Sequence, residues 1–443
     1  MSKIFIEESS LTAIGDAVRA KTGSSDLLVV PDGMVSAISS IETGGGGDSG
    51  IPEEAFTITG NCSYRFANNG WNWFVENYGN RVTTKDITNI LNIFNSSNKL
   101  TKIPFAINLK ENTQNIEARY AFSNCSNIDK VTINVPTTSS LDSMANMFAS
   151  CNKLTTISNI NCNHTTYKDM SYLFYYCNSL EQLPYLYNAY PSNITYIFGT
   201  CQKLRSIPED YFDTWNFDRI NTYTHAGSGN VFADCHSLRQ IPIKILSYLG
   251  NSTVSKSSYN CLYNTLFDKC YALDEIIGMP VDVNTELTSN VFGSTIAGCS
   301  RIKNLTFATN EDGSPKVTHW RNQTLDFASN FTGYASNASN ITGFNSGITA
   351  DKEVKDDATY QALKNDADWF TTKPAYCRYN HDSAVATINS LPDTSAYLAS
   401  AGGTNTIKFK GESGSATNGG AINTLTEEEI AVATAKGWTV TFS

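Results

Sequence analysis

The chain has 443 residues, of which 17% are Asp, Glu, Lys or Arg, and its formal net charge is −10. An acidic chain without a run of Lys or Arg is a poor match for a polyanion, so we expect neither nucleic acid nor an anionic membrane as its main partner. A single closed hydrophobic core does not grow to this length, which predicts several domains or an array of repeats.

The N-terminal region predicts a small helical module followed by a linker. The opening MSKIFIEESS has no long apolar run, so we expect no signal peptide, no membrane span and synthesis in a cytosol. Ser10 and Asp32 can each cap a short helix with one apolar face. Two such helices are too small to fold alone, so we expect residues 1–42 to dock on a partner or on copies of themselves. Residues 43–50, which contain GGGGDSG, predict a flexible linker.

Two tryptophans open the next region. Trp71 and Trp73 stand two residues apart in NGWNWF, so on a strand both would face the same side. One interpretation is that they cover the open end of the first repeat, as terminal repeats require. The other is that they form an aromatic platform for a sugar.

A repeating frame follows, and Lys168–Pro184 (KDMSYLFYYCNSLEQLP) shows it most clearly. Met170, Leu173, Phe174 and Cys177 stand at i, i+3, i+4 and i+7, the spacing that places four apolar side chains on one face of a short helix. Further apolar residues follow at three-residue steps until a proline ends the segment. The frame therefore predicts a short helix that buries one face.

The frame recurs at steps that run from 24 residues (Cys177 to Cys201) to 39 residues (Cys299 to Ala338). Ordered motifs at this period indicate a repeat array over residues 51–350, in which each unit buries its apolar face only against its neighbours. The predicted repeat core consists of Phe94, Phe122, Cys125, Phe148, Cys151, Phe174, Cys177, Phe198, Cys201, Phe232, Cys235, Phe267, Cys270 and Cys299.

Seven of the eleven cysteines occupy this one repeat position. In an array they would lie above one another in the interior, so we expect free thiols that act as small hydrophobic side chains. Their separation excludes the paired Cys-x-x-Cys spacing of zinc sites, and we expect no metal and no cofactor. The other four are Cys62, Cys162, Cys261 and Cys377, and the sequence leaves their pairing open.

The recurring F-x-x-C-x-x-L-x-x-I/L-P resembles the leucine-rich repeats of the BspA-like type. The similarity spans about Phe56 to Ala350. It implies an α/β repeat fold, a leucine-rich-repeat solenoid with one short helix and one short strand per unit.

Tyrosines cluster within thirty residues of the array. Some of them alternate with core positions and must point outward, and tyrosines supply rigid contact area with a hydrogen-bonding tip. The sequence leaves open whether they form a receptor-binding surface or pack between neighbouring repeats. The cluster consists of Tyr167, Tyr172, Tyr175, Tyr176, Tyr185, Tyr187, Tyr190 and Tyr196.

The sequence offers little for catalysis. None of the five histidines stands in a known metal or nucleophile motif. Glu209, Asp210 and Asp213 could supply the paired carboxylates of a glycan depolymerase, but a Pro-Glu-Asp turn is more typical of a solvated loop. We therefore expect no enzymatic activity.

The repeat frame is lost from about residue 351, and residues 351–443 predict a C-terminal capping region. Residues 351–376 and 381–391 are helix-prone, and residues 404–410 alternate as a strand does. Thr426 and Glu429 form a capping box for a helix that Gly437 ends, and a last strand follows.

Two segments resemble parts of phage structural proteins. SSLTAIGDAVRAKTGSSDLLVVPDGMVSAISSI, in residues 1–42, is similar to the N-terminal segment of tail-associated proteins of phages that infect Gram-positive gut bacteria. LTEEEIAVATAKGWTVTFS, at the C-terminus, is similar to the last unit of phage leucine-rich-repeat tail proteins. The resemblance implies a virion protein of a tail fibre or baseplate, a homo-oligomer on the particle, that is attached to other virion proteins through residues 1–42.

The sequence therefore predicts a virion protein that binds a host cell-surface glycan or protein. One alternative is a purely structural tail, baseplate or capsid component that never contacts the host. The other alternative is a depolymerase of a cell-surface glycan.

Overall fold

The computed structural model describes residues 56–217, 229–242, 245–246, 266–327, 381–409 and 425–442. Within 266–327 it leaves out residues 271, 282–285, 289–291, 293–295, 297–298, 300–301 and 303. The predicted helical module (1–42), the linker (43–50) and the helix-prone segment 351–376 lie outside the described residues. The chain divides into two compact units: the first comprises Met1–Thr165 and Pro184–Asn188, and the second comprises Thr166–Leu183 and Ala189–Ser443.

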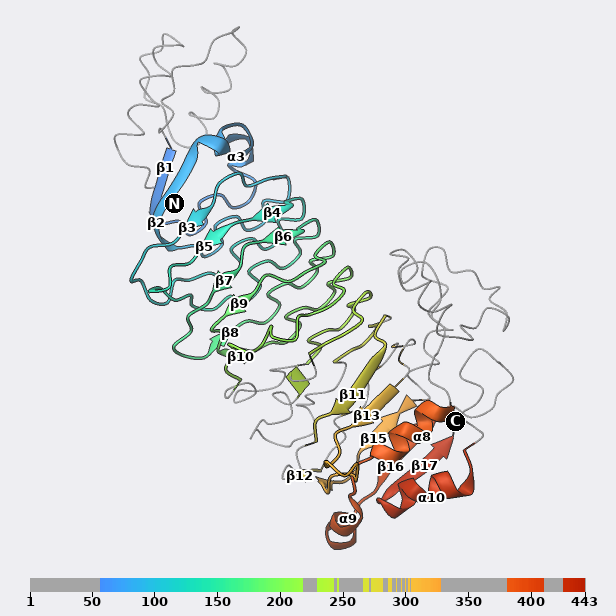
Figure 1. Cartoon of the computed structure of the whole chain (residues 1–443). Coiled ribbons are helices and arrows are strands. Elements are labelled where there is room, and N and C mark those ends of the chain that lie inside the picture. Colours follow the sequence, from blue (N-terminus) through green and yellow to red (C-terminus); the bar gives the residue numbers. More distant parts are fainter. Residues whose placement is uncertain are drawn as a thin grey trace, which may run out of the picture. The chain divides into compact units, whose positions relative to one another are not determined.

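The first unit is built from short strands that lie side by side in parallel pairs (Figure 1). Strand β1 pairs with β2, β3 with β5, β4 with β6, and β7 with β9, and every one of these pairs is parallel. Parallel pairing of strands that follow one another along the chain requires the chain to return to the same end each time, which makes each repeat one coil. The elements are β1 (Phe56–Asn61), α3 (Asn72–Tyr78), the 3₁₀-helix η1 (Gly79–Arg81), β2 (Val82–Asn89), β3 (Ile107–Asn108), β4 (Lys130–Val131), β5 (Ile133–Asn134), β6 (Thr156–Ile157), β7 (Ile160–Asn161) and β9 (Leu186–Tyr187).

The apolar frame of each coil forms two tight turns. In one coil, the Ile93 N–H donates to the Ile90 carbonyl at 3.1 Å, and Asn92, in the third place of this turn, has φ of 54°. The second turn closes from the Ser97 N–H to the Phe94 carbonyl at 3.0 Å. Turns of this type need a left-handed residue in their third place. Positive φ recurs there in Tyr64, Asn68, Asn92, Ser96, Tyr120, Asn124, Asn146, Ser150, Tyr172, Tyr176, Tyr196, Thr200, Asn230, Asp234 and Lys269.

The turns of neighbouring coils are joined by backbone hydrogen bonds. The Phe94 N–H donates to the Ala121 carbonyl of the next coil at 2.7 Å, and the Asn92 N–H donates to Arg119 at 3.0 Å. Backbone N–H groups of a coil thus alternate between its own turns and the next coil. This arrangement satisfies backbone groups that would be costly to bury unpaired.

The predicted short helix of each repeat is therefore wrong, because in the described coils that segment consists of turns. An α-helix needs negative φ throughout, and in the segments that are described completely two residues adopt the left-handed conformation. Two consecutive turns nevertheless bury positions i, i+3, i+4 and i+7, which is the pattern that predicted the helix. The chain is therefore a repeat protein, with short parallel strand pairs around a buried aromatic core.

The interior of the first unit is a column of stacked phenylalanine rings. The centroids of Phe94 and Phe122 are 5.6 Å apart, and those of Phe122 and Phe148 are 5.2 Å apart with nearly parallel planes. Beside the rings lies a column of side chains that donate hydrogen bonds to the preceding coil. The Cys125 Sγ donates to the Phe94 carbonyl at 3.0 Å, and the Ser97 Oγ donates to the Phe66 carbonyl at 2.6 Å. The cysteine position therefore supplies both small apolar volume and one hydrogen bond to the preceding coil.

The second unit repeats this interior in its own coils. Phe174, Phe198, Phe232 and Phe267 stack with centroid distances of 5.7 to 6.0 Å. Four cysteine thiols of this unit donate to the phenylalanine carbonyl of the preceding coil at 3.0 to 3.2 Å: Cys201, Cys235, Cys270 and Cys299. Its strands again form parallel pairs, β8 (Lys168–Asp169) with β10 (Pro191–Asn193), β11 (Glu275–Met279) with β13 (Asn304–Phe307), and β12 (Glu286–Leu287) with β14 (His319–Trp320).

The described residues of the C-terminal part of the second unit contain a three-stranded parallel sheet and three helices. The order is β15 (Thr324–Asp326), β16 (Asn405–Phe409) and β17 (Trp438–Phe442), with helices α8 (His381–Ser390), α9 (Ser395–Ala401) and α10 (Glu427–Ala435). Thr426 caps α10 together with Glu429, which confirms the predicted capping box, helix and final strand. Among the described residues, no helix is long and apolar enough to cross a membrane.

Candidate functional site

Four of the eight predicted tyrosines meet on the second unit. The rings of Tyr172 and Tyr196, from neighbouring coils, stack with centroids 5.3 Å apart. Tyr175 lies edge-on against both of them at 5.3 Å and against Tyr176 at 4.5 Å. We call Tyr172, Tyr175, Tyr176 and Tyr196 the tyrosine surface. Its members are partly exposed, and Tyr176 is 41% exposed.

The turn geometry and one glycine explain why these rings meet. Tyr172 and Tyr196 occupy the same left-handed turn place in successive coils, so their side chains leave the backbone in the same direction. Gly199 occupies the place that Tyr175 holds one coil earlier. A Cβ at Gly199 would lie 2.6 Å from Tyr196 Cδ1 and 3.2 Å from Tyr175 Cδ2, so the missing side chain makes room for both rings.

The tyrosine surface adjoins a small group of charges. Burial, together with Tyr172, Asp234 and Asp268, raises the pKa of Tyr196. Burial and the neighbouring phenols raise the pKa of Tyr175 to about 12. The Lys269 Nζ lies 3.2 Å from Asp234 Oδ1, so the nearby charges of opposite sign are paired. At neutral pH the phenol hydroxyls of Tyr175 and Tyr196 are therefore uncharged.

The other four tyrosines lie elsewhere. Tyr167 and Tyr190 contact each other in the second unit, with ring centroids 6.5 Å apart. Tyr185 and Tyr187 stack in the first unit with centroids 5.5 Å apart and an interplanar angle of 7°. The predicted cluster is thus one surface of four rings and two separate pairs.

Trp71 and Trp73 do not lie on a strand, which corrects the expectation drawn from their spacing. Trp71 immediately precedes α3, and Trp73 lies within it. A turn at Asn69 and Gly70 starts this helix, and the Trp71 carbonyl accepts its hydrogen bond from the Val75 N–H at 3.0 Å. The Trp71 ring packs against buried Phe66 and Phe74, and the ring of Trp73 contacts Tyr78. Both tryptophans thus take part in the packing of the first coil.

The remaining predicted residues lie either on the surface or in the interior of the described part of the chain. Glu209, Asp210 and Asp213 are all exposed. The fourteen predicted core residues are all buried. Burial raises the pKa of the Cys125 and Cys201 thiols to about 12, so they stay protonated and unreactive at neutral pH. Within the described ranges no three His, Cys, Asp or Glu residues gather to hold a metal ion.

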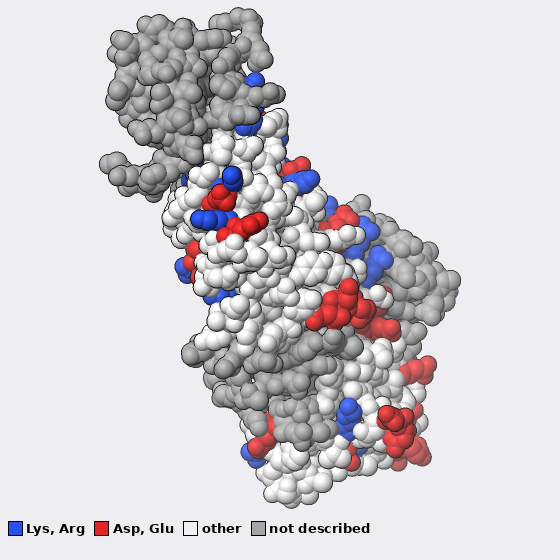
Figure 2. Space-filling view, turned by 60° about the vertical axis from the view of Figure 1, so that its left-hand side comes forward, with Lys and Arg blue, Asp and Glu red and all other residues white. Residues whose placement is uncertain are grey.

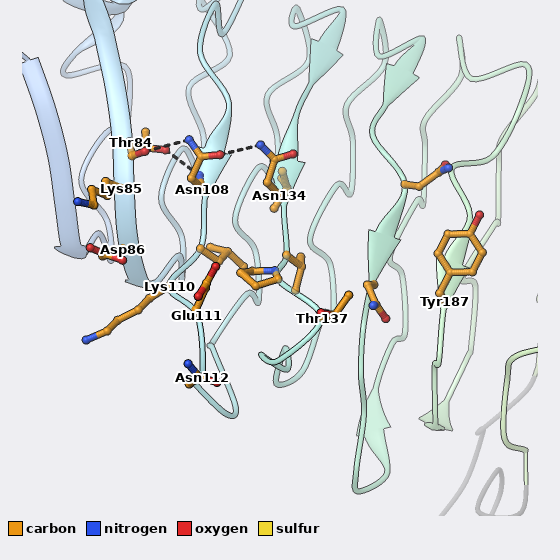
Figure 3. Close-up of a pocket in the computed structure, with 16 residues that line it drawn as sticks. Thr84, Lys85, Asp86, Asn108, Lys110, Glu111, Asn112, Asn134, Thr137 and Tyr187 are labelled. Carbon is orange, nitrogen blue, oxygen red and sulfur yellow. Dashed lines mark hydrogen bonds between the residues drawn. The ribbon is translucent and has the colours of Figure 1, made fainter. Parts of the chain in front are cut away.

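Sequence reasoning missed a polar groove on the first unit, shown in Figure 3. It has a volume of about 1000 Å³ and is lined by residues of five successive coils. The side chains of Thr84, Asn108 and Asn134 lie in one row across three strands (Figure 3). The Asn134 Nδ2 donates to Asn108 Oδ1 at 2.6 Å, and the Asn108 Nδ2 donates to the Thr84 carbonyl at 2.9 Å. Tyr187 lies at the other end of the groove.

A repeated dipeptide could have revealed this groove. Ile-Asn recurs at 107–108, 133–134 and 160–161, and in each case the isoleucine is buried while the asparagine lies on the opposite side of the strand. Alternation along a strand places successive side chains on opposite faces. The apolar frame drew attention to the turns, whereas these strands are only two residues long and give a weak periodic signal.

The charged residues that Figure 2 shows lie in separate groups on the visible face. Uncharged residues predominate on this face.

Comparison with known proteins identifies one similarity. A family model described as a Mycoplasma protein of unknown function, DUF285, matches residues 61–183 and again residues 116–240. The two matches overlap, so this part of the chain is similar to a DUF285 domain that is repeated. No curated protein and no solved structure matches the chain.

Proposed function

We propose that this chain is a phage virion protein that binds a host cell-surface glycan or protein through a leucine-rich-repeat solenoid of the BspA-like type. Residues 1–42 would attach it to other proteins of the tail fibre or baseplate. The resemblance of both terminal segments to phage tail proteins supports the location, and the repeated frame supports the solenoid. Several copies on one particle would let weak single contacts add up, because tethered copies bind at high effective concentration.

The tyrosine surface is the observation that carries this proposal. Its rings hold one another in place, so little side-chain entropy is lost when a ligand binds. Rigid aromatic rings with polar tips are typical of residues that dominate binding energy. A merely structural coil does not require them: alanine occupies the place of Tyr175 at Ala149 and Ala233.

The test compares the full chain with a double variant, Tyr175→Ala with Tyr176→Ser, whose new residues already occur at these places in other coils. Fluorescently labelled protein is titrated onto intact cells and purified cell-wall polysaccharide of Gram-positive gut bacteria. We expect the affinity of the double variant to be at least about tenfold lower, because the loss of a central contact residue typically has an effect of this size.

Tyr120→Asn is the matched control, because Tyr120 is also 41% exposed and lies on the first unit. This variant should bind like the unchanged chain. Equal binding by the double variant would contradict the role of the tyrosine surface. If the unchanged chain bound no cell or wall fraction, and electron microscopy of the virion found the repeats covered by other virion proteins, the purely structural alternative would replace this proposal.

A further inference from the structure

We propose that the groove of the first unit is a second binding site, which takes a linear, uncharged glycan that lies across the strands with about one sugar unit per coil. The site is separate from the tyrosine surface and does not depend on it. It rests on the spacing, the hydrogen-bonding groups and the charge balance of the groove.

The spacing comes from the strand pairs. Asn108 of β3 is in register with Asn134 of β5, and Asn161 of β7 is in register with Tyr187 of β9. Neighbouring strands lie about 4.8 Å apart. An extended sugar unit in a linear glycan has nearly the same length. Side chains repeated at this spacing can therefore contact successive sugar units in the same way.

Several polar atoms of the groove are available to a ligand. The Nδ2 of Asn134 donates to Asn108 Oδ1, and among the described residues no donor contacts the Oδ1 of Asn134. Asn159 and Asn161 use their Oδ1 atoms to accept from the Tyr185 N–H and the Asn188 Nδ2, and no acceptor in the described part of the chain contacts their Nδ2 groups. The groove thus offers both acceptors and donors in fixed positions. A sugar hydroxyl, which donates and accepts, satisfies both kinds of group.

The charges of the groove favour an uncharged ligand. Lys85 and Lys110 are balanced by Asp86 and Glu111, so the lining carries no net charge. A polyanion would meet two carboxylates, and a polycation would meet two ammonium groups. Tyr187 is 38% exposed and is held by stacking on Tyr185, which gives one end of the groove an aromatic face against which a sugar ring can pack.

The test measures binding of the full chain to neutral oligosaccharides by isothermal titration calorimetry. The probes are cello-, laminari- and chito-oligosaccharides, each in a length series from dimer to heptamer, with oligogalacturonate as the acidic comparison. We expect one neutral series to bind, with an affinity that rises with length and levels off near the pentamer because five coils line the groove. Asn134→Ala should weaken this binding about fivefold and Tyr187→Ala about tenfold.

The controls separate binding from folding and from the tyrosine surface. Asn152 is exposed in the same unit and does not line the groove, so Asn152→Ala should bind normally. Tyr187→Phe keeps the ring and should retain most of the affinity. The Tyr175→Ala, Tyr176→Ser variant should bind the oligosaccharide unchanged. Binding to none of the neutral series, preference for the acidic oligosaccharide, or equal binding by both groove variants would overturn the proposal.

Discussion

At the scale of single residues, the left-handed turn places decide the local structure. Each coil needs positive φ at two places, and the chain fills them with Asn, Ser and Asp but also with Tyr, Lys and Thr. Asn tolerates this conformation because its short polar side chain can bond locally, whereas larger side chains are strained by about 1–2 kcal/mol. Some of these residues therefore reduce stability, which is understandable for the tyrosines if they form the binding surface that we propose.

The sequence identified which residues are buried but not the conformation of the residues between them. Phe174 and Cys177 were placed correctly in the interior because burial follows from the apolar pattern alone. The positive φ of Tyr172 and Tyr176 could not be predicted, because tyrosine has no preference for it. The contact of Tyr172 with Tyr196 depends on that conformation, so the sequence did not predict this contact either.

Tyr120→Asn tests the strain at a turn place. Tyr120 has φ of 55° and is 41% exposed, and asparagine holds this place in the coils on either side, at Asn92 and Asn146. We expect the substitution to raise the free energy of unfolding by up to about 1 kcal/mol, because the strain falls and little buried area is lost. Chemical denaturation followed by circular dichroism measures the change. Tyr120→Val should instead lower stability, since a β-branched residue is poorer still at positive φ, and equal effects of the two substitutions would contradict this account.

At the scale of elements, the same spacing can arise from two local structures. Positions i, i+3, i+4 and i+7 are buried by a helix and also by two consecutive turns with left-handed third residues. The C-terminal helix α10 was predictable because Thr426 and Glu429 give it a specific start signal. The coils carry no such signal, and their structure depends on hydrogen bonds to the next coil, which one segment alone does not reveal.

The contact between α8 and α10 should make stability depend on pH. The His381 Nε2 lies 3.1 Å from Glu429 Oε2, and its Nδ1 lies 3.4 Å from Asp382 Oδ1. Burial would lower the pKa of His381, but the hydrogen bonds to Asp382 and Glu429 outweigh it and raise the pKa above its ordinary value. The backbone hydrogen bond from Thr426 lowers the pKa of Glu429, so the carboxylate stays ionised into the acid range.

A histidine with a raised pKa stabilises the folded state below its unfolded pKa, and the contribution is lost as pH rises through the folded value. We therefore expect His381→Gln to lower the melting temperature at about pH 5.5 and to have a smaller effect at about pH 8.5. Differential scanning calorimetry of both proteins at the two pH values measures this. The same loss at both values would show that the histidine acts through packing and not through charge.

At the scale of the whole molecule, the two units share one kind of interior. Each has a column of stacked phenylalanines and, beside it, a column of side chains that donate to the preceding coil. This repetition was predictable from the sequence, because the frame recurs in order. The polar groove left only a weak signal in the sequence, the repeated Ile-Asn dipeptide, because it forms only when strands from five coils lie side by side.

The buried thiol columns are the central claim about the molecule, and counting reactive thiols tests it most directly. Nine cysteines of the described residues are buried thiols, and Cys261 and Cys377 lie outside those residues. In a chain with Cys261→Ser and Cys377→Ser, a thiol reagent such as Ellman's reagent should find no reactive cysteine in the native state. After unfolding in guanidinium without reductant it should find nine. Several rapidly reacting thiols in the native chain, or fewer than nine after unfolding because disulfides had formed, would contradict the stacked interior.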